Sequence, residues 1–176
     1  RQSRALKERG PIKCDENKPG IMVIVIGESA SKYHQGLYGY QRNTNPLLSS
    51  IRNELFIFDS VIAPHSHTNP VISKVMTFAD FDNMDYLYSK RNIIEYFKDA
   101  GYKTFWLSNQ PFIEKFSTIA SSIGTTADWY VFTNNQNDGD ENELNSFDEV
   151  LFKPFEIALN DKSEYKFIVL HLMGSH

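Results

Sequence analysis

The chain has 176 residues, of which 41% are hydrophobic and 23% are charged, a composition typical of one globular domain with its own core. A formal net charge of −4 gives no electrostatic basis for binding nucleic acid. The single cysteine, Cys14, excludes an internal disulfide and a cysteine-based zinc cluster, and no apolar run is long enough to cross a membrane.

Residues 1–20 open with the basic stretch RQSRALKERG, and the first residue is Arg rather than Met. We expect this segment to be a linker or a juxtamembrane segment, with a solvated tail as the favoured form. We also expect the chain to be a piece of a longer protein.

Apolar runs rich in β-branched and aromatic residues predict strands from residue 21 onward. In chain order these strands are Ile21–Ile26, Leu55–Ala63, Tyr102–Asn109, Asp128–Phe132 and Tyr165–Leu172. Amphipathic runs between them predict helices at Asn45–Asn53, Thr68–Ala79, Asn92–Ala100, Phe112–Ile123 and Phe147–Leu159. Strands separated by helices predict an α/β domain, with a mostly parallel central sheet and helices on both faces.

Two of these elements carry an expectation about burial. The run Ile21–Ile26 is continuously apolar, as in a central parallel strand that is buried on both faces. In the helix that follows the second strand, Val71, Val75 and Phe78 share one face, which we expect to be the buried one. The polar, acidic segment Thr133–Ser146 predicts a loop.

Ligands of open parallel sheets bind outside the carboxyl ends of the strands. Polar side chains follow four of the predicted strands: Glu28 and Ser29; His65, His67 and Thr68; Ser108, Asn109 and Gln110; His171 and His176. Their convergence at one edge predicts a polar site that can bind a metal.

Glu28 and Ser29 allow different interpretations. A nucleophilic Ser29 would need a G-x-S-x-G turn, but Ser31 stands where the second glycine would be, so a helix N-cap is favoured for Ser29. Glu28 is either a carboxylate in a first helical turn or a metal ligand. The second interpretation is supported by the run Ile21–Ile26 directly before Glu28, which contains no basic residue to balance its charge.

Thr68 stands two residues before Pro70, at the start of a predicted helix. It can therefore be an N-cap, whose hydroxyl bonds the first turn. A hydroxyl at a helix N-terminus also lies where a phosphate binds, and contact with a metal would make it a nucleophile. The two roles are compatible.

Five sequence blocks occur in order from about residue 21 to residue 176: VIVIGES…LYGYQRNTNPLL, DSVIAPHSHT…VMTF, GYKTFWLSNQ, DEVL and VLHLMGSH. Together they resemble the phosphoethanolamine transferases, which belong to the sulfatase branch of the alkaline phosphatase superfamily. The resemblance implies a fold of that type. It also implies that residues 21–176 are the N-terminal part of a periplasmic catalytic domain, incomplete at its C-terminus.

The resemblance assigns roles to individual residues. It implies that Glu28 binds zinc, with Mn²⁺ a less favoured ion, and that Thr68, 40 residues later, is a nucleophile that also contacts the metal. His176 is similar to a histidine that contacts the phosphate or a second metal. The family's remaining zinc ligands, an Asp-His pair in a D-H-G-E-type block, have no counterpart in this sequence. Asn109 is expected to contact substrate, because an amide at a strand end can donate to phosphate.

The implied reaction transfers phosphoethanolamine from phosphatidylethanolamine, through a phospho-threonine intermediate, to an envelope acceptor such as lipid A or a lipooligosaccharide core sugar. Transmembrane helices N-terminal to the domain would anchor it at the periplasmic face of the bacterial inner membrane. The alternatives are a related sulfatase or phosphoglycerol transferase, and a non-catalytic domain of the same fold. The segment SHTNPVISK lacks the C/S-x-P-x-R pattern from which sulfatases make formylglycine.

These interpretations predict distances and burial. One zinc ion must reach both oxygens at roughly 2 Å, so Glu28 and Thr68 should lie within about 5 Å of each other. His171 should be buried, and at most one of His65 and His67 should approach the site.

Overall fold

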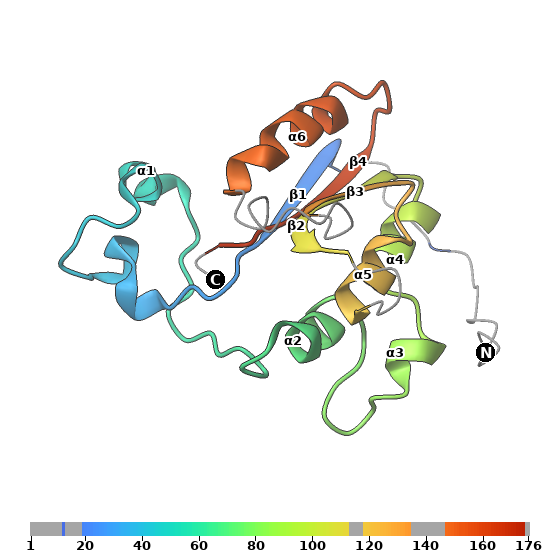
Figure 1. The fold of residues 1–176 in the computed structure, drawn as a ribbon, viewed down its shortest axis with the longest axis horizontal. Helices are drawn as coiled ribbons and strands as arrows, with labels where there is room; N and C mark the ends of the chain where they lie inside the picture. The colour runs from blue at the N-terminus through green and yellow to red at the C-terminus, as the bar shows by residue number, and fades with distance from the viewer. Residues whose placement is uncertain (1–11, 13–18, 113–117, 135–146, 175–176) are drawn as a thin grey trace.

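The computed structural model describes Ile12 and residues 19–112, 118–134 and 147–174 (Figure 1). Within these residues the strands are β1 Ile21–Ile26, β2 Lys103–Pro111, β3 Trp129–Asn134 and β4 Lys166–His171. The α-helices are α1 Pro46–Ser50, α2 Thr68–Val75, α3 Tyr86–Ser89, α4 Ile93–Asp99, α5 Ile119–Gly124 and α6 Phe152–Leu159. Short 3-10 helices are η1 Lys32–His34, η2 Gly36–Tyr38, η3 Arg52–Glu54 and η5 Asp148–Leu151. No helix in the described part has the length and apolar character needed to cross a bilayer.

The strands form one parallel sheet in the order β1-β4-β2-β3. The last residue of β4, His171, pairs with Ile26 of β1 and with Ser108 of β2. The carboxyl ends of these strands therefore meet at one edge of the sheet. The predicted α/β class with a parallel sheet is confirmed, and every predicted strand except Leu55–Ala63 is present within two residues of its expected bounds.

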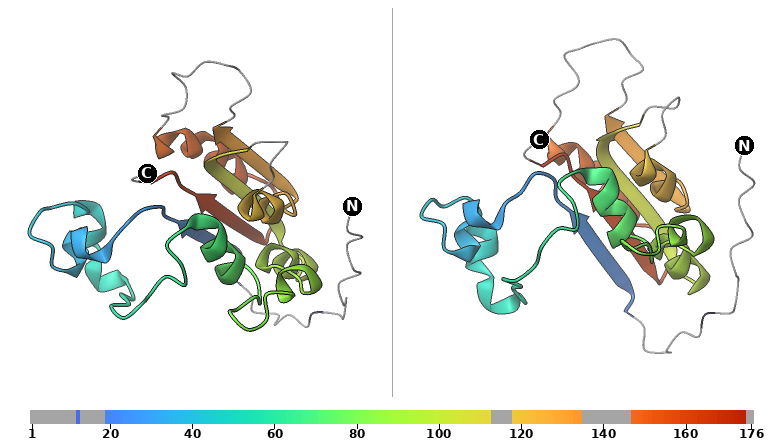
Figure 2. Two further views of the ribbon diagram at one scale, coloured as in Figure 1. Left: turned by 60° about the horizontal axis from the view of Figure 1, so that its bottom comes forward. Right: turned by 90° about the horizontal axis from the view of Figure 1, so that it is seen from below.

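Helices cover both faces of the sheet, as predicted (Figure 2). One core cluster joins α2, α4 and α5 to the sheet and contains Trp106 and Phe167. The other joins η5 and α6 to the opposite face and contains Phe105 and Leu107, the neighbours of Trp106 along β2. Successive side chains of a strand point to opposite faces, so the apolar centre of β2, Phe105 to Leu107, contributes to both clusters.

β1 is an edge strand, so the prediction that it is buried on both faces is wrong within the described residues. Its only strand partner there is β4. The alternate residues Ile21, Val23 and Val25 are 48%, 41% and 58% exposed. Its apolar composition alone does not reveal this position, because the same run would suit a central strand.

The predicted strand Leu55–Ala63 is absent. After η3 the chain continues as irregular structure, and Phe56 and Ile62 are 96% and 90% exposed. A strand needs a neighbour to bond its backbone, and no described strand pairs with this segment. The predicted helix Asn45–Asn53 is divided into α1 and η3 at Ile51.

The helix predicted at Thr68–Ala79 is present as α2, but it is shorter and buries a different face. Ile72 and Met76 are buried and belong to the core cluster that contains α5. Val75 and Phe78, which we expected to be buried, are 56% and 58% exposed.

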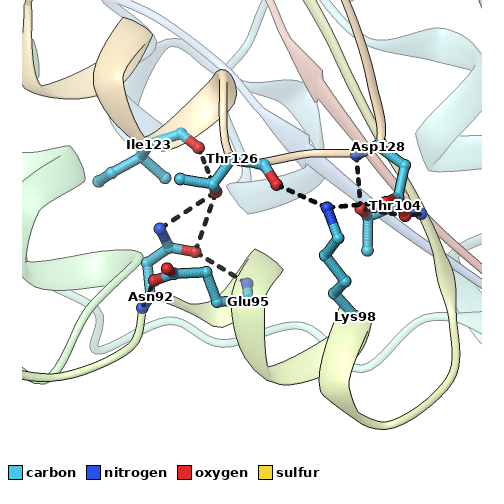
Figure 3. Close-up of polar contacts among 7 residues, drawn as sticks. All are labelled: Asn92, Glu95, Lys98, Thr104, Ile123, Thr126 and Asp128. Carbon is cyan, nitrogen blue, oxygen red and sulfur yellow. Dashed lines mark hydrogen bonds and ion pairs between the residues drawn. The ribbon is translucent and has the colours of Figure 1, made fainter. Parts of the chain in front are cut away.

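A polar network joins α4 to the amino ends of β2 and β3 (Figure 3). Asn92 is the N-cap of α4 and forms a capping box with Glu95. Asp128 accepts hydrogen bonds from the backbone N and hydroxyl of Thr104 at 3.0 and 2.9 Å and pairs with Lys98 at 2.7 Å. Burial alone would raise the pKa of Asp128, but the bonds from Lys98 and Thr104 and the Lys98 charge lower it below its ordinary value.

Parts of two predicted elements lie outside the described residues. These are residues 113–117 of the predicted helix Phe112–Ile123 and residues 135–146 of the predicted loop Thr133–Ser146. The described remainder of the helix is α5, and the first residues of the predicted loop end β3.

Candidate functional site

The carboxyl edge of the sheet brings Glu28 and Thr68 together, although 40 residues separate them. Glu28 follows β1, and Thr68 is the first residue of α2. The Thr68 hydroxyl donates a hydrogen bond to Glu28 Oε2 at 2.6 Å. The predicted proximity is confirmed, while the roles of nucleophile and metal ligand stay predictions.

The N-cap alternative for Thr68 is wrong. The N-cap of α2 is His67, whose side chain makes no capping hydrogen bond. The Thr68 hydroxyl donates its hydrogen bond to Glu28 and not to the first turn of the helix. The oxygen therefore lies at the N-terminus of α2, where the helix dipole favours negative charge.

Ser29 supports the Glu28 carboxylate rather than capping a helix as predicted. Its backbone N–H and its hydroxyl approach Glu28 Oε1 at 3.1 and 3.4 Å. Its φ of 50° is the left-handed conformation that non-glycine residues rarely adopt. The helix cap in this stretch is Ser31, whose side chain accepts a bond from Tyr33 N. Both carboxylate oxygens of Glu28 thus have a donor.

His171 is buried at the end of β4, as predicted, with 1% of its surface exposed. Its Nδ1 lies 3.4 Å from Ser108 Oγ, and its Nε2 has no hydrogen-bond partner among the described residues. Burial lowers its pKa from the ordinary value of 6.5 to about 4, against the opposing charges of Glu28 and Asp148. The imidazole is therefore neutral near pH 7, the form that can accept a hydrogen bond or bind a metal.

Asp148, at the start of η5, is a site residue that the sequence analysis missed. Its carboxylate accepts bonds from Asn109 Nδ2 at 3.0 Å and from the backbone N–H groups of Met173 and Gly174 at 2.7 and 2.8 Å. The only sequence signal was its position in the family-like block DEVL. That block points to no role, because the partners of Asp148 lie far away in the sequence.

Asn109 is fully buried beside Asp148. Its amide nitrogen donates to Asp148, and its amide oxygen accepts from Thr133 Oγ1 at 2.8 Å. This geometry favours a supporting role, and the predicted contact between Asn109 and substrate stays untested. His176 lies outside the described residues, so its predicted role is untested as well.

His65 and His67 are both exposed, just before α2. Their contacts are local: His67 N donates to His65 Nδ1 at 3.1 Å, and Ser66 Oγ lies 3.1 Å from His67 Nδ1. Among the bonds of the described residues, neither histidine reaches Glu28 or Thr68, which is compatible with the expectation that at most one approaches the site.

Glu28 and Thr68 fit part of a zinc site. Carboxylate oxygen is a common zinc ligand, and the two oxygens, 2.6 Å apart, are close enough to share one ion. Neither Glu28 oxygen forms an ion pair within the described residues, so its charge is available to a cation. A protein zinc site needs three or four protein ligands, and the described residues contain no group of three or more His, Cys, Asp or Glu placed to hold a metal. The remaining ligands would lie beyond these residues.

Comparison with known proteins agrees with this geometry. A family model described as Sulfatase matches residues 21–176. The phosphoethanolamine transferase EptC of Escherichia coli K12 is 32% identical over 163 residues, which cover 91% of this chain and 28% of that protein. The phosphoethanolamine transferase CptA of Salmonella typhimurium LT2 is 33% identical over 161 residues, which cover 90% of this chain and 27% of that protein.

A solved structure extends the comparison to three dimensions. The crystal structure of the C-terminal periplasmic domain of EptC from Escherichia coli, in complex with Zn, matches with a TM-score of 0.82 at 32% identity. The match covers 91% of this chain and 45% of that chain. The chain thus spans less than a third of the two transferases and less than half of the solved domain.

Proposed function

The chain belongs to the sulfatase family, and because it is also similar to two phosphoethanolamine transferases, we propose that it is part of an enzyme with that activity. The proposed reaction moves phosphoethanolamine from phosphatidylethanolamine to an envelope acceptor such as lipid A or a lipooligosaccharide core sugar. The contact between Thr68 Oγ1 and Glu28 Oε2 at 2.6 Å carries this proposal. It joins a nucleophilic hydroxyl to a carboxylate that can bind a metal.

The proposed location is the periplasmic face of the bacterial inner membrane, with an anchor in the N-terminal part of the whole protein. The support is that the similar solved domain is a C-terminal periplasmic domain. A donor lipid and an envelope acceptor are both within reach of an enzyme at that surface.

Glu28 and Thr68 would hold Zn²⁺, in preference to Mn²⁺, together with ligands beyond the described residues. Bound zinc would favour loss of the hydroxyl proton and offset the negative charge that develops on the phosphate. The chain's own groups orient the reacting oxygen. Glu28 Oε2 holds the hydroxyl of Thr68, and the N-terminus of α2 directs its dipole at the incoming phosphate.

Two displacements at phosphorus complete the transfer. In the first, Thr68 Oγ1 forms a bond to the phosphorus of phosphatidylethanolamine as the bond to the diacylglycerol oxygen breaks. The proton of the Thr68 hydroxyl ends on the departing diacylglycerol oxygen. In the second, an acceptor oxygen attacks the same phosphorus, and Thr68 leaves with the proton that the acceptor gives up. Phosphoethanolamine is thus held on Thr68 between the steps.

The test uses the full-length protein, incubated with phosphatidylethanolamine in the absence of acceptor. Intact-mass and peptide analysis should find Thr68 heavier by about 123 Da, the mass added by phosphoethanolamine in a covalent scheme. Thr68→Ala should abolish the adduct and turnover, and Thr68→Ser should keep part of both because the hydroxyl remains. Thr125→Ala is the matched control, since the Thr125 hydroxyl bonds only Ser122 O, at 3.1 Å, within the described residues.

Other outcomes would favour the alternatives. Full turnover by Thr68→Ala without an adduct would contradict the mechanism. Release of phosphoethanolamine to water regardless of acceptor would indicate a hydrolase of the same superfamily. Failure of the wild-type protein to bind zinc or form an adduct would indicate a non-catalytic domain of this fold.

A further inference from the structure

Asp148 lies where η5 meets the carboxyl ends of β2 and β4. We propose that it is a positioning residue: it holds the turn at Met173 and Gly174 against the backbone of Glu28, and so determines where the Glu28 carboxylate meets Thr68. This inference rests on the proposed function of Glu28 and Thr68. It adds to that function a residue that contacts neither the reacting oxygen nor the metal-binding carboxylate.

Asp148 gathers three segments with one carboxylate. Oδ1 accepts from Met173 N at 2.7 Å and from Asn109 Nδ2 at 3.0 Å, and Oδ2 accepts from Gly174 N at 2.8 Å. Hydrogen bonds to an ionised carboxylate are roughly twice as strong as those between neutral groups. Asn109 is itself fixed, because it is fully buried and its oxygen is bonded to Thr133. The bonds therefore tie the turn after β4 to a rigid part of β2.

Gly174 transmits this constraint to Glu28. Its φ is +64°, and a Cβ added there would lie 2.4 Å from the carbonyl oxygen of Glu28 and 3.0 Å from its nitrogen. The turn thus packs directly on the Glu28 backbone, at a separation that no side chain permits. Two residues before Gly174, Leu172 N donates a hydrogen bond to Ile26 O at 2.9 Å, which joins the chain leading into the turn to the end of β1.

A simple helix-capping role does not explain these contacts. Asp148 is the first residue of η5, where an acidic residue is favourable for the helix itself. Its hydrogen-bond partners among the described residues all belong to other segments: one is in β2 and two lie after β4. The carboxylate is thus directed at the site rather than at its own helix.

The consequence concerns the placement of Glu28. Its backbone is supported by Gly174, and its Oε1 is held by Ser29 N at 3.1 Å. Loss of the Asp148 bonds would release the first of these supports. A metal-binding carboxylate that is free to move by about 1 Å binds its ion and orients its nucleophile poorly.

The experiment compares Asp148→Ala and Asp148→Asn with wild type in the full-length protein, using Zn²⁺ alone as the probe. Affinity is measured by competition with a chromophoric chelator, and hydrogen exchange follows the peptide that contains residues 172–174. We expect Asp148→Ala to weaken zinc binding by about 10- to 100-fold, as for loss of an outer hydrogen-bond partner of a metal ligand. The exchange of that peptide should quicken by about tenfold. Asp148→Asn keeps one acceptor oxygen and should lie between.

Glu149→Gln is the matched control. Glu149 directly follows Asp148 and its side chain is exposed, so the substitution removes one negative charge without removing the contacts of Asp148. It should leave zinc affinity and hydrogen exchange unchanged. A second variant, Gly174→Ala, disturbs the same turn from the other side and should also weaken zinc binding. The double variant Asp148→Ala with Gly174→Ala should lose less affinity than the sum of the single losses, since both act through one contact.

The outcomes separate this inference from the function on which it rests. Zinc affinity of the folded Asp148 variants equal to wild type would overturn the positioning role and leave the proposed function intact. Fully additive losses in the double variant would overturn it as well, because the two residues would then act independently. Absence of zinc binding by wild type would instead overturn the proposed function, and with it the site that Asp148 is inferred to position.

Discussion

At the amino ends of β2 and β3, Asp128 pairs with Lys98 at 2.7 Å, whereas at the carboxyl ends Glu28 and Asp148 contact only neutral donors within the described residues. The amino-end network balances its charge internally and joins α4 to the sheet (Figure 3). The carboxyl end collects two carboxylates around a hydroxyl and backbone N–H groups, and among the described residues neither carboxylate forms an ion pair.

The difference indicates that the Asp128 carboxylate stabilises the fold, whereas the carboxylates at the carboxyl end serve the proposed site. Partly buried negative charge is unfavourable unless it is paired or binds a metal. A protein that can place Lys98 beside Asp128 could also place a cation beside Glu28. No described Lys or Arg forms an ion pair with Glu28, as expected of a site whose positive charge comes from a bound ion. The two ends should therefore respond differently to mutation and to pH.

Glu28→Gln should have the largest effect, and the effect should be on activity. Turnover in the full-length protein should fall by about 1,000-fold, the upper range for loss of one group that stabilises charge in the transition state. Stability of the metal-free protein should not fall, because the carboxylate has no cation to lose. Steady-state kinetics and urea unfolding measure the two effects, and a large loss of stability with activity retained would break the comparison.

His171 should make the stability of the metal-free protein pH-dependent. Its folded pKa of about 4 lies below the unfolded value of 6.5, so its contribution is complete above pH 6.5 and is lost as the pH falls toward 4. At 1.36 kcal/mol per pH unit this amounts to roughly 3 kcal/mol.

Urea unfolding between pH 7 and pH 4 in the presence of a chelator measures this dependence. His171→Gln should remove most of it, because glutamine does not titrate. An equal slope in wild type and variant would assign the dependence to other groups.

Asp128→Ala should lower stability without lowering activity. Thr104 is fully buried, and its N–H and hydroxyl would lose their shared acceptor, at an expected loss of about 2 kcal/mol. Urea unfolding of the variant, with the exposed control Glu156→Gln, measures this. A fall in turnover of the still-folded variant would contradict the separation of the two ends.

The Asp128 contribution should also have its own pH range. The folded pKa is lower than the unfolded one, so the contribution is present above the unfolded value of about 3.9 and is lost as the pH falls through the folded pKa. The stability difference between wild type and Asp128→Asn should therefore be constant from pH 5 to pH 7 and shrink below about pH 4. This range lies below that of His171.

Ser29→Ala should have the smallest effect. The bond from Ser29 Oγ to Glu28 is 3.4 Å long, while the backbone N–H bond at 3.1 Å survives the substitution. Loss of such a weak, exposed bond should change turnover by about twofold at most. Steady-state kinetics decide, and a loss as large as that of Glu28→Gln would make Ser29 part of the chemistry.

The amino-acid sequence by itself determined the fold class and the composition of the carboxyl edge. The runs at Ile21–Ile26, Tyr102–Asn109 and Tyr165–Leu172 are rich in β-branched and aromatic residues over strand lengths, and the helical runs between them favour parallel pairing. Parallel strands end at one edge, which places Glu28, Ser108 and His171 there. The proximity of Thr68 to Glu28 was expected from the family resemblance, because the strand predicted before Thr68 is absent.

Tertiary packing decided two local features that the sequence analysis assigned to the wrong residues. Val71, Val75 and Phe78 recur at helical spacing along α2 and the residues after it, but so do Ile72 and Met76, and contact with the core cluster that contains α5 buries the second set. Ser29 and Ser31 are both plausible caps, and the left-handed turn at Ser29 leaves the cap to Ser31.

The strand expected at Leu55–Ala63 and the role of Asp148 depend on partners that are distant in sequence. A strand exists only beside another strand, and nothing within Leu55–Ala63 specifies one. Asp148 draws its donors from Asn109, Met173 and Gly174, which become its neighbours only after β2 and β4 have paired. The local sequence pattern specifies helices and strands. Hydrogen bonds between segments far apart in the sequence form only when folding brings their donors and acceptors together, so the sequence pattern does not reveal them.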